Sequence, residues 1–223
     1  MSLGRLIGAV EALRQSGHGS LIVHASPTAG TLLHAPSELT LSRVGIGLYG
    51  IWPSDATRRA VESRDPAVDV DLRPVLSWKS RLAQVKSVPR GGTVGYDLTY
   101  RAASERRIGV VPVGYYDGFD RGLSSRGQVL VGGRRVPVVG RVAMNMFMVD
   151  VTGGDARDGD EVVLIGEQGE EAVTADDVAS WSDTIAYEVV SRLNPRLPRR
   201  LVGAEPGERL DEDDVGGRPI ERG

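Results

Sequence analysis

The chain contains no cysteine and few aromatic residues: Phe, Trp and Tyr make up only 5% of its 223 residues. Without cysteine there is no disulfide, no thiolate zinc site and no cysteine nucleophile. No apolar run approaches the roughly 20 residues that a membrane-spanning helix needs. No basic start followed by an apolar stretch marks a signal peptide. We therefore expect a cytoplasmic protein with no membrane partner.

The balance of charge is ordinary for a soluble globular protein. Hydrophobic residues make up 40% of the chain and charged residues 26%, and the formal net charge is -3. A weakly acidic balance does not indicate a nucleic-acid partner, and no set of metal ligands stands out. The length is enough for one large domain or two small domains with real cores.

The first 52 residues alternate helical and strand-like patterns. Residues 3–15 have apolar positions at helical spacing, followed by a stop signal at Gly17. Apolar runs at 21–24 and 39–49 predict buried strands, each leading into a turn. This order is typical of parallel βα units. A (β/α)8 barrel takes about 250 residues, so two units predict only the closing part of such a barrel, with a small independent α/β layer as the alternative.

The composition changes after Trp52. Residues 53–73 are polar and weakly periodic, which predicts a loop or linker. Residues 74–202 carry short β-like runs separated by Gly-rich or charged turns, which is typical of a small barrel or sandwich. Near 174–194 we expect helices, with Thr174 as an N-cap. The Gly-, Pro- and acid-rich tail, 203–223, is predicted to be disordered.

The central stretch of the chain is VVPVGYYDGFDR, at residues 110–121. An apolar run that ends in Gly, Tyr and Asp predicts a buried strand followed by a tight turn. A turn that projects Tyr115 or Tyr116 from a rigid strand end suits chemistry, because loops on rigid scaffolds carry function. The alternative interpretation is a hairpin with two surface tyrosines.

Further motifs follow the same order as in one known family. GRVAMNMFMVDV lies at 140–151 and DTIAYEVVSRLNPRLPR at 183–199, while VHASPTAG and SRVGIGLYG come early. Together with VGYYDGFDRG, they resemble alanine racemases from about Arg5 to Val202. The resemblance implies the closing part of a TIM-type barrel followed by a mostly-β C-terminal domain. It implies interconversion of L- and D-alanine, a peptidoglycan precursor, with pyridoxal 5'-phosphate (PLP) as cofactor.

The same resemblance assigns cofactor contacts in the first 52 residues. It puts Thr28 and the backbone of Gly45 and Ile46 at the phosphate, where free N–H groups suit an anion. Arg43 would face the pyridine nitrogen, with His24 behind it. Because arginine stays protonated, it can donate to the ring nitrogen without giving up its proton. The ring then stays neutral, which favours simple proton exchange over transamination.

Two of the cofactor assignments leave structural alternatives open, and one position departs from the family. The family commonly has asparagine where this chain has Pro27, so the resemblance leaves one phosphate-region contact unassigned. His24 could instead be a buried histidine at a strand end. Tyr187 matches the tyrosine that hydrogen-bonds the PLP phosphate, but it could also lie on the apolar side of a helix.

Racemisation removes the α-proton on one face and returns it on the other, so it needs two bases. The resemblance makes the cofactor lysine one base and the tyrosine of GYxDG, here Tyr115, the base for the L-enantiomer. A free tyrosine has a pKa near 10, so it needs nearby positive charge or donors that stabilise the phenolate. We expect Asp117 and Arg121 to fix the turn, and Tyr116 has no assigned role.

Met144 matches the methionine of the family's RVxMD pattern, where the backbone lies near the substrate carboxylate. The alternative is a core methionine on a buried strand. The aspartate of the pattern is Asn145 here, which removes a charge but keeps an acceptor. In the family, the tyrosine and the methionine serve the active site of the other subunit. A homodimer with shared active sites is therefore implied.

The chain contains only two lysines, Lys79 and Lys86. Both lie where the family has no cofactor lysine, whereas PLP catalysis requires a Schiff-base lysine. The sequence thus predicts a partial racemase chain, and we expect no racemase activity from it alone. The alternative function is a non-catalytic β-domain that pairs with a separate barrel half or another partner. A preference for serine over alanine also stays open.

Overall fold

The computed structural model describes residues 3–33, 39–64 and 70–202. It divides into two compact units, Met1–Leu193 and Asn194–Gly223. In the second unit, the described residues include a turn in which Leu197 N–H donates to the Asn194 carbonyl. The tail predicted to be disordered, 203–223, lies outside the described residues. Among the described helices, none has the length and apolar character that crossing a membrane requires.

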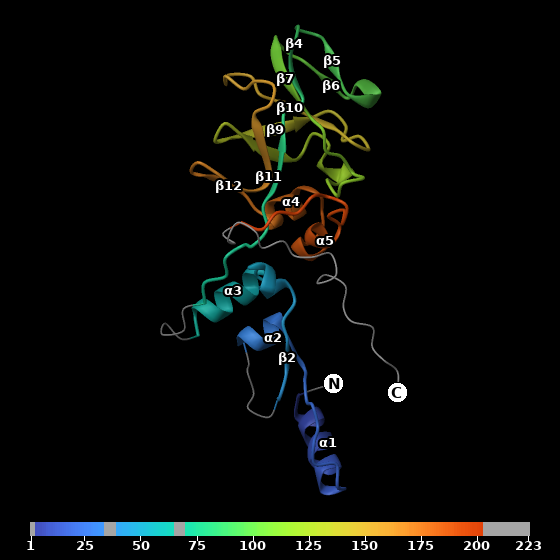
Figure 1. Cartoon of the computed structure of the whole chain (residues 1–223), viewed down its shortest axis with the longest axis vertical. Coiled ribbons are helices and arrows are strands. Elements are labelled where there is room, and N and C mark those ends of the chain that lie inside the picture. The colour runs from blue at the N-terminus through green and yellow to red at the C-terminus, as the bar shows by residue number, and fades with distance from the viewer. Residues whose placement is uncertain (1–2, 34–38, 65–69, 203–223) are drawn as a thin grey trace. The chain divides into compact units, whose positions relative to one another are not determined.

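The amino-terminal segment carries two short parallel strands, each followed by a helix (Figure 1). Its elements are α1 (Leu3–Gln15), β1 (Ser26–Pro27), α2 (Thr28–Leu33), β2 (Ser42–Arg43) and η1 (Ile46–Tyr49). The expected helix over 3–15 is confirmed. The strand expected over 21–24 is wrong, because β1 begins later; Val23 N–H instead donates to Thr40 Oγ1 at 2.8 Å.

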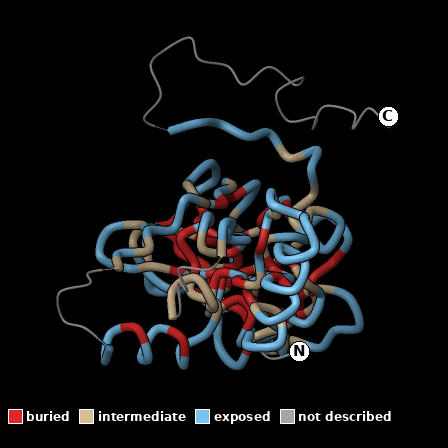
Figure 2. Tube along the Cα trace, turned by 90° about the horizontal axis from the view of Figure 1, so that it is seen from below, coloured by how far each residue is buried: buried red, intermediate tan, exposed pale blue. Residues whose placement is uncertain are grey.

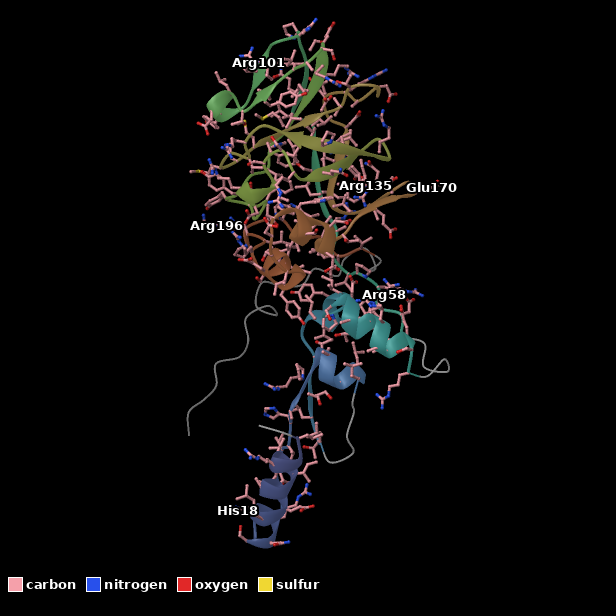
Figure 3. The ribbon with its side chains drawn as sticks, turned by 180° about the vertical axis from the view of Figure 1, so that it is seen from behind. His18, Arg58, Arg101, Arg135, Glu170 and Arg196 are labelled. Carbon is pink, nitrogen blue, oxygen red and sulfur yellow. The ribbon has the colours of Figure 1, made fainter. Side chains whose placement is uncertain are left out.

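The segment expected to be a loop or linker contains a helix, α3 (Asp55–Glu62). Ser54 caps it by accepting a hydrogen bond from Thr57 N–H at 3.1 Å. Arg58, labelled in Figure 3, pairs with Glu62 one turn later at 2.8 Å. A capped first turn and an i,i+4 ion pair support a short helix, so a loop over the whole of 53–73 is wrong.

The rest of the first unit is mostly β. Its strands are β3 (Trp78–Arg81), β4 (Gln84–Val88), β5 (Thr93–Val94), β6 (Tyr100–Arg101), β7 (Arg106–Val111), β8 (Gln128–Val131), β9 (Arg134–Val139), β10 (Phe147–Asp150), β11 (Glu161–Gln168) and β12 (Glu171–Val173). Eight of them form one antiparallel sheet in the order β12-β11-β8-β9-β10-β7-β4, with β3 also paired to β11. β5 and β6 form a separate antiparallel hairpin.

The sheet curls back on itself because one chain segment serves two of its strands. β3 and β4 are separated only by Leu82 and Ala83, yet β3 pairs with β11 and β4 with β7. Leu82 is almost fully buried at this bend. Phe119 stacks on Phe147 at a centroid distance of 4.2 Å and meets Trp78 edge-on. Figure 2 shows buried residues gathered in the interior, with exposed loops around them.

Two short helices and two short 3₁₀ segments complete the described β-rich part of the fold. The helices are α4 (Ala175–Trp181) and α5 (Ala186–Ser191); the 3₁₀ segments are η3 (Arg121–Leu123) and η2 (Tyr96–Leu98), which joins β5 to β6. The predicted N-cap is confirmed: Thr174 accepts from Asp177 N–H, and the Asp177 carboxylate accepts from Thr174 N–H. The two backbone N–H groups, which have no partner within the helix, thus both find an acceptor, as in a capping box.

Candidate active site

The site begins where β7 ends and the chain turns at residues 114–118. Asp117 holds the turn, because its Oδ2 accepts from Gly114 N–H at 2.9 Å. Its own N–H donates to the Gly114 carbonyl at 3.0 Å, and Phe119 N–H donates to the same carbonyl. The strand followed by a tight turn is therefore confirmed, as is the expected role of Asp117.

The turn lies directly against the backbone of a second loop. Tyr115 N–H donates to the Ala143 carbonyl at 3.0 Å, and Tyr116 N–H donates to the Met144 carbonyl at 2.9 Å. A Cβ on Gly114 would come within 2.3 Å of both carbonyl oxygens. Only glycine permits this approach, because no real Cβ contact is that short.

The other end of the turn, at Gly118, is also fixed by contacts with a neighbouring segment. Gly118 has φ +107°, and a Cβ there would lie 2.7 Å from the Arg192 carbonyl oxygen. Asp120 accepts from Gly122 N–H and pairs with Arg192 Nη1 at 2.5 Å. Phe119, between these contacts, is buried in the aromatic cluster. The turn is thus fixed to both neighbouring segments, so the direction of Tyr115 is fixed with it.

Tyr115 and Met144 line one cleft of about 400 Å³. The lining residues come from three loops: Tyr96, Asp97, Tyr115, Arg121, Arg141, Val142, Ala143, Met144 and Asn145. Tyr115 is 42% exposed and Met144 57% exposed. Met144 lies before β10 rather than on it, so the alternative of a core methionine on a buried strand is wrong.

The cleft carries charges that the sequence motifs did not identify. Arg141 and Arg121 both line it, and Arg141 Nε lies 3.6 Å from Asp97 Oδ2. Arg121 was expected only to fix the turn, but it also borders the cleft. Arg141 stands three residues before Met144 in the same motif, and this proximity is the signal that could have identified it. No comparable signal marks Asp97.

The amino-terminal candidates form a second group. The parallel register Pro27↔Arg43 brings the ends of β1 and β2 to the same edge. Gly45 N–H donates to Thr28 Oγ1 at 3.0 Å, which brings together Thr28, Gly45 and the start of η1 at Ile46. A Cβ on Gly47 would lie 2.7 Å from Thr28 Cγ2. The cradle formed by Thr28, Gly45 and Gly47 therefore has no room for a side chain at position 47.

The remaining candidates are exposed and do not line the cleft. Arg43 lies on β2, and His24 precedes β1 outside any strand. The alternative of a buried strand-end histidine is therefore wrong for His24. Tyr187 is the second residue of α5, whose buried residues are Ala186 and Val189. Among the described residues, no group of acidic, His or Cys side chains could hold a metal ion.

The fold and this site define a class: a β-rich domain in which a rigid turn presents a tyrosine to a small, arginine-lined cleft. The family model for the alanine racemase C-terminal domain matches residues 75–201. The alanine racemase of Leptospira interrogans (serovar copenhageni) is 40% identical over 195 residues, which cover 87% of this chain and 50% of that relative. The chain therefore belongs to the alanine racemase family.

Solved structures agree with this placement. The alanine racemase of Streptomyces coelicolor A3(2) superimposes with a TM-score of 0.80 at 38% identity, over 91% of this chain and 51% of that one. The Bacillus anthracis enzyme, solved with bound L-Ala-P, gives 0.74 at 36% identity, over 84% and 46%. The Bartonella henselae enzyme, solved with covalently bound pyridoxal phosphate, gives 0.69 at 27% identity, over 86% and 50%. The chain thus spans about half the length of the relatives it matches.

Proposed function

We propose that this chain is the carboxyl-terminal part of a PLP-dependent alanine racemase, with Tyr115 as the base that acts on L-alanine. The observation that carries the proposal is the shared cleft of Tyr115 and Met144, built on two loops joined by backbone hydrogen bonds. Family membership supports it, and so does L-Ala-P bound to the Bacillus anthracis relative. Both observations favour an alanine racemase over a non-catalytic β-domain.

The proposed domain organisation follows the same logic. Residues 1–52 would be the closing part of a (β/α)8 barrel, 53–73 the linker and 74–202 the carboxyl-terminal domain. The parallel pair β1–β2, with a helix after each strand, supports the barrel assignment. The exposed tyrosine and methionine of the cleft support a homodimer in which these residues serve the partner's active site.

The residues near Thr28 fit a phosphate group. Gly47 leaves no side chain in the cradle, and the Thr28 hydroxyl, which accepts from Gly45 N–H, keeps its own O–H to donate. The backbone N–H of Ile46 lies at the start of η1, where no side chain caps the helix. The Gly45 N–H is taken up by Thr28, so the Thr28 hydroxyl and the Ile46 backbone N–H would hold the phosphate, with Tyr187 as a further donor. When bound, PLP withdraws electrons from the substrate's α-carbon and so acidifies the α-proton.

The other residues have separate tasks in this proposal. Arg43 would donate to the pyridine nitrogen while keeping its own proton, and His24 would orient Arg43. The Tyr115 phenolate oxygen would take the α-proton of L-alanine and return it in the reverse reaction. The backbone at Met144 would hold the substrate carboxylate. The proton transfer itself would then involve only the substrate's α-carbon and the Tyr115 oxygen.

The test is co-expression of the chain with a barrel half that carries a PLP lysine. We expect a yellow, PLP-absorbing dimer that interconverts L- and D-alanine, followed by chiral chromatography. Tyr115→Phe should lower kcat about 10²- to 10⁴-fold, the usual range for a general base, without loss of bound PLP. Tyr116→Phe is the matched control and should stay near the parent rate. Equal rates for the two variants would refute the assignment of Tyr115.

A further inference from the structure

One wall of the cleft is a loop between two strands, residues 140–146, which we call the wall loop. β9 ends at Val139 and β10 begins at Phe147, so the regular ladder stops on both sides of it. The wall loop supplies these residues to the lining of the cleft: Arg141, Val142, Ala143, Met144 and Asn145. Buried backbone groups outside a ladder need other partners. The position of the wall loop therefore depends on individual hydrogen bonds from other segments.

Two serines, Ser124 and Ser125, supply such hydrogen bonds from the segment that follows η3. Ser124 Oγ accepts from Val142 N–H at 3.0 Å, and Val142 is almost fully buried. Ser125 Oγ accepts from Gly140 N–H at 3.1 Å, and Gly140 is buried as well. The two hydroxyl groups thus bind alternate residues of the wall loop, as a neighbouring strand would do.

Ser124 also contacts the segment that leads away from the tyrosine turn at 114–118. Its hydroxyl donates to the Arg121 carbonyl at 2.5 Å, and Arg121 lines the cleft together with Val142. A hydroxyl group can donate one hydrogen bond and accept others at the same time. The preceding residue, Leu123, is fully buried, which anchors Ser124 in the core. One oxygen atom therefore joins two segments that border the cleft.

Ser125 has a backbone conformation that serine rarely adopts. Its φ is +54°, in the left-handed region, where a residue other than glycine costs free energy. In this conformation its hydroxyl contacts the Gly140 N–H and lies 3.4 Å from the Gly140 carbonyl oxygen. Backbone strain of this kind is concentrated at functional sites, where the surrounding structure enforces it. The strained serine thus indicates that the position of Gly140 matters for the site.

We propose that Ser124 and Ser125 are positioning residues, which hold the wall loop at a fixed distance from the tyrosine turn. That turn carries Tyr115, and Tyr116 N–H donates to the Met144 carbonyl in the wall loop. Loss of a serine hydroxyl would leave a buried N–H group without its acceptor and let the backbone at Met144 move relative to Tyr115. The fixed distance follows from the hydrogen bonds alone, whereas its effect on racemisation rests on the proposed function.

Hydrogen exchange of backbone amides in the 223-residue chain, followed in ¹H–¹⁵N spectra, tests the positioning directly. Ser124→Ala removes the hydroxyl group and Ser124→Thr keeps it. We expect the amides of Val142 and Tyr116 to exchange about 5- to 100-fold faster in Ser124→Ala, because an unsatisfied buried donor favours local opening. Ser124→Thr should restore most of the protection. The amide of Val163, fully buried on β11, reports on global unfolding and should change less.

Thr152→Val is the matched control for Ser124→Ala. The Thr152 hydroxyl also accepts a backbone N–H from a distant segment, that of Arg107 at 2.8 Å, but Thr152 does not line the cleft. This variant should leave the exchange of Val142 unchanged relative to that of Val163.

Ser125→Gly is a second variant, which separates positioning from stability. It removes the hydroxyl group, but glycine adopts the left-handed backbone without strain. The amide of Gly140 should therefore exchange faster, while the midpoint of urea unfolding stays near that of the parent chain.

Unchanged exchange at Val142 in Ser124→Ala would overturn the proposal, and so would an equal increase at Val142 and Val163. In the co-expressed complex, Ser124→Ala should raise KM for L-alanine about three- to tenfold and lower kcat less, because Tyr115 keeps its bond to the Ala143 carbonyl. Parent values of KM and kcat in Ser124→Ala would contradict the effect on racemisation. A parent complex that does not racemise alanine would contradict the proposed function alone, since the exchange measurements still test the positioning.

Discussion

At the scale of single residues, the position of Tyr115, the base that we propose, depends on the glycine before it. The GYxDG motif identified Tyr115, and the structure shows why its first residue is Gly114: the turn touches the carbonyls of Ala143 and Met144. The contact joins segments far apart in the chain, so no local pattern reveals it. The same contact brings Arg141 to the cleft, and its place three residues before Met144 was the sign of this in the sequence.

Gly114→Ala should destabilise the chain by about 2–4 kcal/mol, because the added methyl group would force two backbone segments apart. The variant should unfold at a lower urea concentration than the parent chain. Gly19→Ala is the matched control: a Cβ at Gly19 meets nothing within 4 Å, so its midpoint should move little. Equal midpoints for the two variants would contradict the close approach at Gly114.

At the scale of elements, the β5–β6 hairpin is held to the sheet by a small polar cluster. Tyr100 Oη lies 3.4 Å from Asp150 Oδ2 on β10, and Arg106 Nη1 lies 3.6 Å from the same atom. Beneath it lies a hydrophobic group of Val94, Ile108 and Val139. This hairpin also carries Asp97, so its attachment bears on the cleft.

Burial, together with the negative charge of Asp150, raises the pKa of Tyr100 above its ordinary value of 10.0. The folded state therefore releases this proton at a higher pH than the unfolded state. The contribution of Tyr100 to stability is present below pH 10 and is lost as the pH rises through the folded-state pKa. Tyr100→Phe should reduce the alkaline loss of stability, measured by urea unfolding between pH 8 and about 11. Exposed Tyr49→Phe is the control, and an identical pH profile for both variants would contradict the prediction.

Strand boundaries at this scale were only partly predictable. The motif at 140–151 is largely apolar and lies among the expected β-like runs, but β10 covers only Phe147–Asp150 of it. The residues before it form a turn in which Ala143 N–H donates to the Met146 carbonyl. The carbonyls of Ala143 and Met144 receive the N–H groups of the tyrosine turn instead of continuing a ladder. The apolar pattern cannot distinguish these two uses of a backbone carbonyl.

At the scale of the whole molecule, the prediction about activity depends on whether either of the two lysines could serve as the Schiff-base lysine. Lys79 on β3 pairs with Glu161 at 3.1 Å, and Lys86 lies on β4. Neither lines the cleft. We expect the purified 223-residue chain, supplied with PLP, to show no alanine racemisation, and the co-expressed complex to show it. Turnover by the chain alone would refute the requirement for a lysine from outside this sequence, and its loss in a Lys79→Arg, Lys86→Arg variant would assign the role to one of these two lysines.

The sequence alone determined the local features: the helix over 3–15, the cap at Thr174, the β-rich region and the motifs that named Tyr115 and Met144. These features depend on neighbours within a few residues, which a linear pattern records. Only the tertiary structure decided that the sheet curls back through Leu82, that Thr28 meets Gly45, and that Arg141 and Asp97 border the cleft of Tyr115. Those features are contacts between distant segments, and they exist only once the backbones have packed against one another.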